Sequence, residues 1–201
     1  MRIARENKLF DTMNENLSLK DKMITLQITP IATYVFFKSE ISGVDPKQKF
    51  CQLADRSDLP KEFQETWVCD SSNLFFAKYD DAELIQFPDT ITFNGRAAFD
   101  TYSRFITFPT EYAQMIFDHF NLQDFGQLNM DTGIPEIKLF SSFKRANINS
   151  LPNLYVMLDG FAYPIKPSSL FDFEEGKPIT YLRFKPSIDT MIILGYPFFD
   201  N

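Results

Sequence analysis

A short polar segment near the middle of the chain carries the residue types best suited to chemistry. Asp100, Thr101 and Ser103 follow directly on an apolar pair at residues 98 and 99. A carboxylate that a strand delivers into a loop beside hydroxyl groups is a plausible layout for acid–base catalysis. Asp is also a common turn residue, because its side chain bonds its own backbone. A turn acid in a β-domain is therefore the alternative interpretation.

The elements that position this segment are predicted to be a hairpin and a helix. Asn94-Gly95 separates β-type runs at residues 90–93 and 96–99. Since Asn-Gly favours a tight turn with positive φ at both central residues, a hairpin is predicted there. Pro109 suits a first helical turn, where its missing N–H is no loss. A helix over residues 109–120 is predicted to present one apolar face, made by Tyr112, Met115, Ile116 and Phe120.

The rest of the chain is predicted to be mostly β. Asp159-Gly160 indicates a second hairpin, a short helix is predicted over residues 8–19, and residues 166–178 indicate a loop. Residues 38–64 are charged and irregular, which is typical of a linker. The predicted strands cover residues 23–28, 33–37, 67–68, 74–77, 84–87, 137–140, 154–158, 161–165, 179–184 and 190–194.

The composition narrows the class of protein. Of the 201 residues, 44% are hydrophobic and 23 are Phe, so the chain can bury a core. The net charge of −7 argues against a nucleic-acid or anionic-membrane surface. No run reaches the roughly 18 apolar residues of a membrane span, and residues 1–8 lack the apolar run of a signal peptide. We expect no metal or other cofactor.

The two cysteines leave two alternatives open. The spacing of Cys51 and Cys69 fits no zinc-site pattern. They could form a disulfide, which would contribute about 3 kcal/mol in an oxidising compartment. Two buried free thiols are the other alternative.

The segment around Asp100 resembles the second lobe of the pepsin-like aspartic proteases. In that family a hydrophobic pair precedes Asp-Thr-Gly and small hydroxyl residues, and this chain reads Ala-Phe-Asp-Thr-Tyr-Ser at residues 98–103. Residues 150–165 are similar to the family's Ser-Leu-Pro strand, Asx-Gly turn and Tyr-Pro strand. Residues 191–195 are similar to its hydrophobic-hydrophobic-Gly segment, which packs beneath the catalytic loop. The resemblance spans residues 8–201.

The resemblance implies a pepsin-like C-terminal lobe of antiparallel sheets with one or two short helices. Residues 1–37 would be the end of a first lobe with interdomain strands, and residues 38–201 a C-terminal lobe truncated at its end. Asp100 would be one of two acids that share a proton during peptide-bond hydrolysis. Thr101 would tie the two catalytic loops together, and the Ser103 hydroxyl would support the carboxylate.

Partners and location follow from the same resemblance. A polypeptide substrate or peptide ligand is expected, and a first-lobe segment or another chain would supply the second acid. The family implies a secretory, vesicular or extracellular compartment. Gly195 would be small because the Asp100 loop passes close above it, with residues 192 and 194 on one face of the strand and residue 193 on the other.

Departures from the family pattern weaken the expectation of activity. Tyr102 stands where the family has Gly, which adds bulk beside the carboxylate. Two hypotheses remain: part of an aspartic endopeptidase that is not competent as an isolated chain, or a pseudoprotease lobe serving as a peptide-binding or structural module.

A literal Asp131-Thr132-Gly133 lacks the flanking residues of a catalytic loop, so an ordinary turn is expected there. His119, the one histidine, has no nucleophile motif nearby and is expected at the surface or in the partial core.

Overall fold

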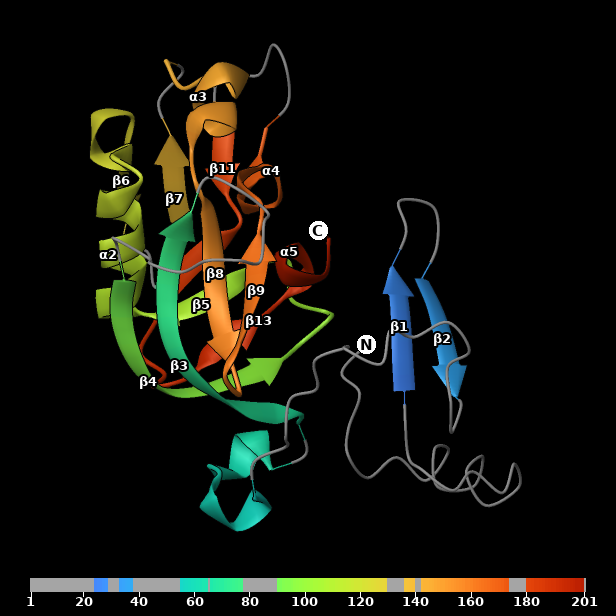
Figure 1. Ribbon diagram of the computed structural model, residues 1–201. Helices are drawn as coiled ribbons and strands as arrows, with labels where there is room; N and C mark the ends of the chain where they lie inside the picture. Colours follow the sequence, from blue (N-terminus) through green and yellow to red (C-terminus); the bar gives the residue numbers. More distant parts are fainter. Residues whose placement is uncertain are drawn as a thin grey trace.

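The protein is built mainly from strands, with a few short helices (Figure 1). This computed structural model describes residues 24–28, 33–37, 55–64, 66–77, 90–129, 136–139, 142–173 and 180–200. The predicted mostly-β architecture is confirmed. Outside the described residues lie the predicted helix at residues 8–19, the strand at residues 84–87 and the Asp131-Thr132-Gly133 triplet.

The described strands form three sheets. The two-stranded sheet pairs β1 (Ile24–Ile28) with β2 (Thr33–Phe37). The four-stranded sheet contains, in spatial order, β10 (Phe171–Asp172), β11 (Thr180–Leu182), β7 (Glu136–Leu139) and β6 (Gly126–Asn129). The seven-stranded sheet contains, in spatial order, β12 (Phe184–Ser187), β5 (Ile106–Pro109), β13 (Ile192–Leu194), β4 (Thr90–Phe99), β3 (Val68–Ala77), β8 (Asn153–Leu158) and β9 (Phe161–Ile165).

Helices and 3-10 turns lie between these strands. The described helices are α2 (Thr110–His119), α3 (Arg145–Ser150), α4 (Pro167–Leu170) and α5 (Tyr196–Phe199). The 3-10 turns are η1 (Arg56–Asp58), η2 (Lys61–Phe63) and η3 (Leu122–Asp124). No helix among the described residues is long and apolar enough to cross a membrane.

The predicted helix after Pro109 is confirmed as α2, but its buried face differs from the predicted one. Pro109 is the residue before the first helical position, and it leaves no orphaned N–H there. Ala113, Ile116 and Phe117 are buried in the main core, whereas Met115 is 48% exposed. Ile116 and Phe120 of the predicted face are buried and Tyr112 packs against the core, so only the placement of Met115 was wrong.

The predicted hairpin at Asn94-Gly95 is wrong, because β4 runs without a break from Thr90 to Phe99. Its pairing with β3 shifts register between Ser71 and Asn73, which is a β-bulge. At the bulge the ring of Phe93 lies directly over Gly95. A Cβ added to Gly95 would lie 2.6 Å from the Cζ atom of that ring. Gly95 thus serves a close packing contact and not a turn.

The predicted hairpin at Asp159-Gly160 is confirmed. β8 and β9 pair antiparallel, with Leu158 opposite Phe161. Asp159 has φ 47° and Gly160 has φ 79°, as a two-residue turn with positive φ at both positions requires. The Asp159 N–H also donates to the carbonyl oxygen of Asp70 at 3.0 Å, which ties this turn to β3.

Strand β13 lies between β4 and β5 in the large sheet. It runs parallel to β4 and antiparallel to β5. Ile192 and Leu194 are buried in the main core, and Ile193 packs on the opposite face, so the predicted alternation is confirmed. A Cβ on Gly195 would lie 2.0 Å from the carbonyl oxygen of Phe105 and 2.8 Å from that of Ser103. The predicted close backbone approach above Gly195 is confirmed.

A second, smaller core covers the opposite face of the large sheet. Leu59 and Phe63, on the segment with η1 and η2, pack there with Val68, Ala98 and Met191. This segment, predicted as a linker, therefore has a packing role. Cys69 on the adjoining strand is buried and disulfide-bonded, which decides between the two alternatives left open by the sequence.

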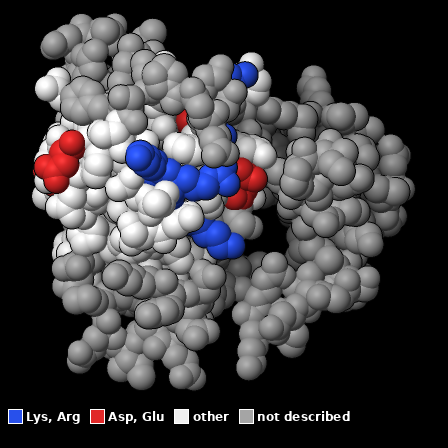
Figure 2. All heavy atoms as spheres, turned by 90° about the horizontal axis from the view of Figure 1, so that it is seen from above, with Lys and Arg blue, Asp and Glu red and all other residues white. Residues whose placement is uncertain are grey.

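Ion pairs and a hydrogen bond hold Asp200, the residue after α5, against the rest of the fold. Arg183 forms ion pairs with Asp172 at 3.5 Å and with Asp200 at 3.7 Å. The Ser169 hydroxyl donates to the carbonyl oxygen of Asp200 at 2.6 Å. On the face seen from above, basic side chains likewise gather next to acidic ones (Figure 2). Such intermixing gives no large field of one sign on the described part of this face.

Gly195→Ala should destabilise the protein by several kcal/mol, because the added methyl group meets two backbone carbonyls that cannot rotate away. Gly160→Ala is the matched control, since a Cβ there meets nothing within 4 Å. It should cost only the roughly 1–2 kcal/mol of a left-handed backbone. Urea denaturation of both variants measures the difference. Equal losses would contradict the close approach.

Reduction of the disulfide should lower the free energy of unfolding by about 3 kcal/mol, because the unfolded chain loses a constraint. The measurement is a denaturation curve of the wild-type chain with and without dithiothreitol. The double variant Cys51→Ala/Cys69→Ala should show no response to the reductant. A wild-type curve that the reductant leaves unchanged would contradict the bond.

Candidate functional site

The loop that carries Asp100 is clamped to the end of β13. It joins β4 to β5 across the strand that lies between them. The Asp100 N–H donates to the carbonyl oxygen of Leu194 at 3.0 Å. Further along the loop, the Ser103 carbonyl oxygen accepts the Tyr196 N–H at 2.8 Å. These two bonds lie on either side of Gly195, so the loop and the Gly segment form one rigid unit.

The Asp100 carboxylate is held by its own loop. Its Oδ1 atom accepts the Tyr102 N–H at 3.1 Å, and the Asp100 carbonyl oxygen accepts the Ser103 N–H at 3.1 Å. The residue is half-buried. Among the residues that the structure describes, Oδ2 has no hydrogen-bond partner and Asp100 contacts no second carboxylate. One oxygen therefore orients the group and the other stays available to a ligand or a second acid.

The two hydroxyl residues beside Asp100 lie in the same turn. The Ser103 hydroxyl donates to the Phe105 carbonyl oxygen at 2.8 Å and accepts the Phe105 N–H at 3.2 Å. It therefore fixes the second half of the loop, and it makes no bond to the carboxylate. Thr101 is half-buried at the top of the turn.

Tyr102 fits this loop without a left-handed backbone. Among the described non-glycine residues, positive φ occurs only at Asn121 and Asp159. The Tyr102 side chain is 79% exposed, so its bulk lies in solvent while its N–H still reaches Asp100. The carboxylate is thus supported although the glycine of the family pattern is missing.

An aromatic cluster joins the end of β4 to α5. Phe99 lies 6.1 Å from Phe198 and 6.2 Å from Phe199, measured between ring centroids. Tyr163 lies 6.1 Å from Phe198 and extends this aromatic cluster to β9. Burial, and secondarily the Asp159 charge, raise the pKa of Tyr163. Phe99, Tyr163 and Phe198 are partly buried and pack against the main core.

Other chemical candidates are not brought to this loop. His119 stacks on Phe76, with the ring centroids 3.6 Å apart, in keeping with a partial-core position. No group of three or more His, Cys, Asp or Glu side chains in the described ranges is arranged to hold a metal ion.

Comparisons with known proteins support the fold. No protein-family model matches the sequence, and no curated protein matches it either. Among solved structures, the chain is similar to the crystal structure of an aspartic proteinase from Irpex lacteus, with a TM-score of 0.55 and 11% sequence identity. The match covers 84% of this chain and 46% of the proteinase. The described chain therefore has the fold of a pepsin-like lobe, and it spans about half the length of that proteinase.

Proposed function

We propose that this chain supplies one half of the two-carboxylate site of a pepsin-like aspartic endopeptidase, with Asp100 as its acid. The observation that carries the proposal is the clamp between the Asp100 loop and Gly195, which fixes a half-buried carboxylate with one unbonded oxygen. The similarity to half of an aspartic proteinase supports it.

The second acid would come from a first-lobe segment or another chain. Two carboxylates about 3 Å apart cannot both ionise, so they would share one proton. One would take a proton from the attacking water while the other donates to the peptide carbonyl. Within this scheme the Tyr102 N–H keeps Asp100 Oδ1 in place and leaves Oδ2 for the shared proton. Thr101 would tie the two loops, and Ser103 would stiffen its own loop through Phe105.

A second proposal is a non-catalytic lobe that binds peptides. The exposed Tyr102 ring beside the carboxylate favours it, because this bulk lies where a partner loop or substrate would approach. Large exposed aromatic residues are typical anchors of protein interfaces. The disulfide at Cys69 fits a secretory or extracellular location under either proposal.

The purified chain should not cleave proteins at acid pH, because it holds one acid of the pair. Haemoglobin or casein digestion with and without pepstatin measures this. Pepstatin-sensitive cleavage that Asp100→Asn abolishes would instead show that two copies complete the site. Asp131→Asn is the control and should change nothing in either case.

The peptide-binding alternative gives a different result with the same protein. A peptide ligand selected against the chain should bind with unchanged affinity to Asp100→Asn. It should bind about fivefold more weakly to Tyr102→Ala, because an exposed aromatic anchor is lost. Fluorescence anisotropy measures both variants. Loss of binding in Asp100→Asn with no effect of Tyr102→Ala would argue for the peptidase site.

A further inference from the structure

The loop that carries Asp100 also exposes aromatic and cationic side chains. Tyr102 is 79% exposed, Phe105 is 36% exposed, and Arg104 between them is exposed as well. Lys185 of β12 reaches the same loop, with its Nζ atom 5.3 Å from the centroid of the Phe105 ring. Two aromatic rings and two cations therefore lie on one short loop and the strand beside it. These four residues, Tyr102, Arg104, Phe105 and Lys185, are called the loop rim below.

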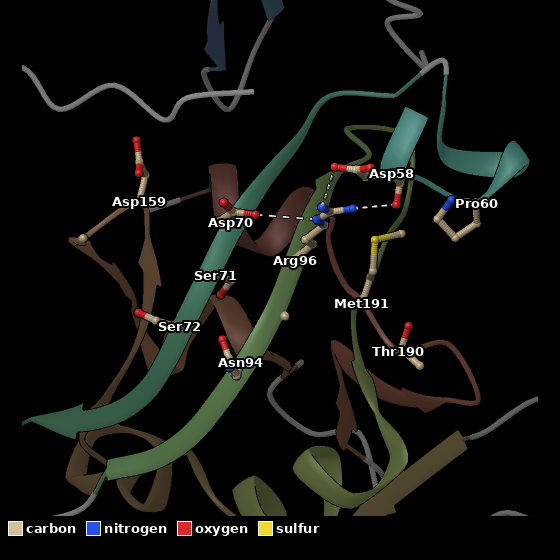
Figure 3. A pocket seen from close by; sticks show the side chains of 12 residues that line it. Asp58, Pro60, Asp70, Ser71, Ser72, Asn94, Arg96, Asp159, Thr190 and Met191 are labelled. Carbon is tan, nitrogen blue, oxygen red and sulfur yellow. Dashed lines mark hydrogen bonds and ion pairs between the residues drawn. The ribbon is translucent and has the colours of Figure 1, made fainter. Parts of the chain in front are cut away.

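The two cations of the loop rim are not neutralised by the protein. Neither Arg104 nor Lys185 forms an ion pair with a carboxylate of the described residues. Arg96 is the contrasting case (Figure 3). It lies in a polar pocket of about 740 Å³, where its guanidinium forms ion pairs with Asp58 at 3.8 Å and with Asp70 at 3.6 Å. An exposed cation without such a pair keeps its charge for a binding partner.

The charge of the loop rim differs in sign from that of the whole chain. Asp100 is the one acidic residue within residues 100–105, so it leaves one positive charge in excess when counted with Arg104 and Lys185. Arg183, two residues before Lys185, is paired with acidic side chains and adds no free positive charge. The whole chain has a net charge of −7. At physiological ionic strength, exposed charges more than about 8 Å away are largely screened, so a short ligand at the loop rim meets mainly its two cations.

The loop rim is held in place before any ligand arrives. The Ser103 hydroxyl bonds both the N–H and the carbonyl oxygen of Phe105, and the Phe105 backbone packs against Gly195. Lys185 is fixed by the pairing of β12 with β5, in which it lies opposite Thr107. A pre-formed surface loses little conformational entropy on binding.

The mixture of cations and aromatic rings narrows the class of ligand. A guanidinium binds a carboxylate through two parallel hydrogen bonds, and an ammonium binds it as a compact charge. Exposed aromatic rings are typical anchors for apolar side chains of a partner. A short peptide can offer carboxylates and an apolar side chain together. A nucleic acid is a long polyanion, which would extend from the loop rim over a protein of net charge −7.

We propose that the loop rim binds a short acidic segment of another polypeptide, in which carboxylates flank an aromatic residue. The inference rests on the peptide-binding role proposed above for this loop, and it adds the class of peptide. The carboxylates contact Arg104 and Lys185, and the aromatic side chain packs on Tyr102. Phe105 contributes by holding the Lys185 ammonium over its ring.

NMR titration of the ¹⁵N-labelled whole chain with three capped pentapeptides tests the proposal. The peptides are Gly-Glu-Phe-Glu-Gly and its analogues with Gln or Lys in place of both Glu residues. The Glu peptide should bind saturably, with shifts concentrated in residues 100–105 and 184–187. The Gln peptide should bind at least fivefold more weakly and the Lys peptide more weakly still. The affinity for the Glu peptide should fall as salt is raised.

Variants of the loop rim locate the binding. Arg104→Gln and Lys185→Gln should each weaken binding of the Glu peptide about threefold, as loss of an exposed ion pair predicts. Arg104→Lys should retain most of the affinity. Arg145→Gln is the matched control, because Arg145 is an exposed cation 5.5 Å from the ring of Phe173, on α3 and outside the loop rim. It should leave the affinity unchanged, and thermal melts of every variant separate loss of binding from loss of folding.

Three outcomes would overturn the proposal. Equal binding of the three peptides would refute the acidic preference and leave the peptide-binding role, whereas binding of none would count against both. An effect of Arg145→Gln equal to that of Arg104→Gln would show a general charge effect and no site. Self-association in light scattering that Arg104→Gln abolishes would assign the loop rim to a second copy of this chain instead.

Discussion

The absence of a side chain at Gly195 is the constraint on which the Asp100 loop depends. Two carbonyl oxygens, those of Ser103 and Phe105, occupy the space that a Cβ would fill. This close contact lets the loop pack on the end of β13. The loop then donates one backbone hydrogen bond to Leu194 and accepts another from Tyr196, on either side of the glycine. That approach brings the backbone of Asp100 and the start of α5 together, whereas the Tyr102 N–H orients the Asp100 carboxylate. A flexible loop could not hold a half-buried acid in this way.

Short sequence patterns predicted the fold correctly where the preference of the local residues agrees with the pairing and packing imposed by distant ones. Asp159-Gly160 and Asn94-Gly95 are both hairpin signals, yet only the first forms a turn. At Asn94-Gly95, pairing with β3 continues through the dipeptide, and the extra residue is absorbed as a bulge under Phe93. The gain from ten residues of continuous strand outweighs the turn preference. No pattern within residues 90–99 reveals the neighbouring strand that decides this.

The clamp and the pocket illustrate two different limits of sequence reasoning. The contact between residues 100–105 and Gly195 was predictable because a family resemblance joins two distant motifs. The partner of the Ser103 hydroxyl was not, since a rotation of one side chain chooses between Asp100 and Phe105. The pocket brings together Asp58, Arg96 and Asp159, which belong to no common motif. Short elements such as α4, with four residues, carry too little periodicity to be recognised in the sequence.

The position of β13 also determines the order in which the molecule can be completed. Its three residues lie between two strands that come about ninety positions earlier in the sequence. Until this segment arrives, β4 and β5 each present an unpaired edge toward the same gap, and such edges can pair with other chains. Contacts of such long sequence separation form slowly. A ribosome must therefore synthesise and release β13 before Asp100 acquires its support, and the nascent protein is exposed to aggregation until then.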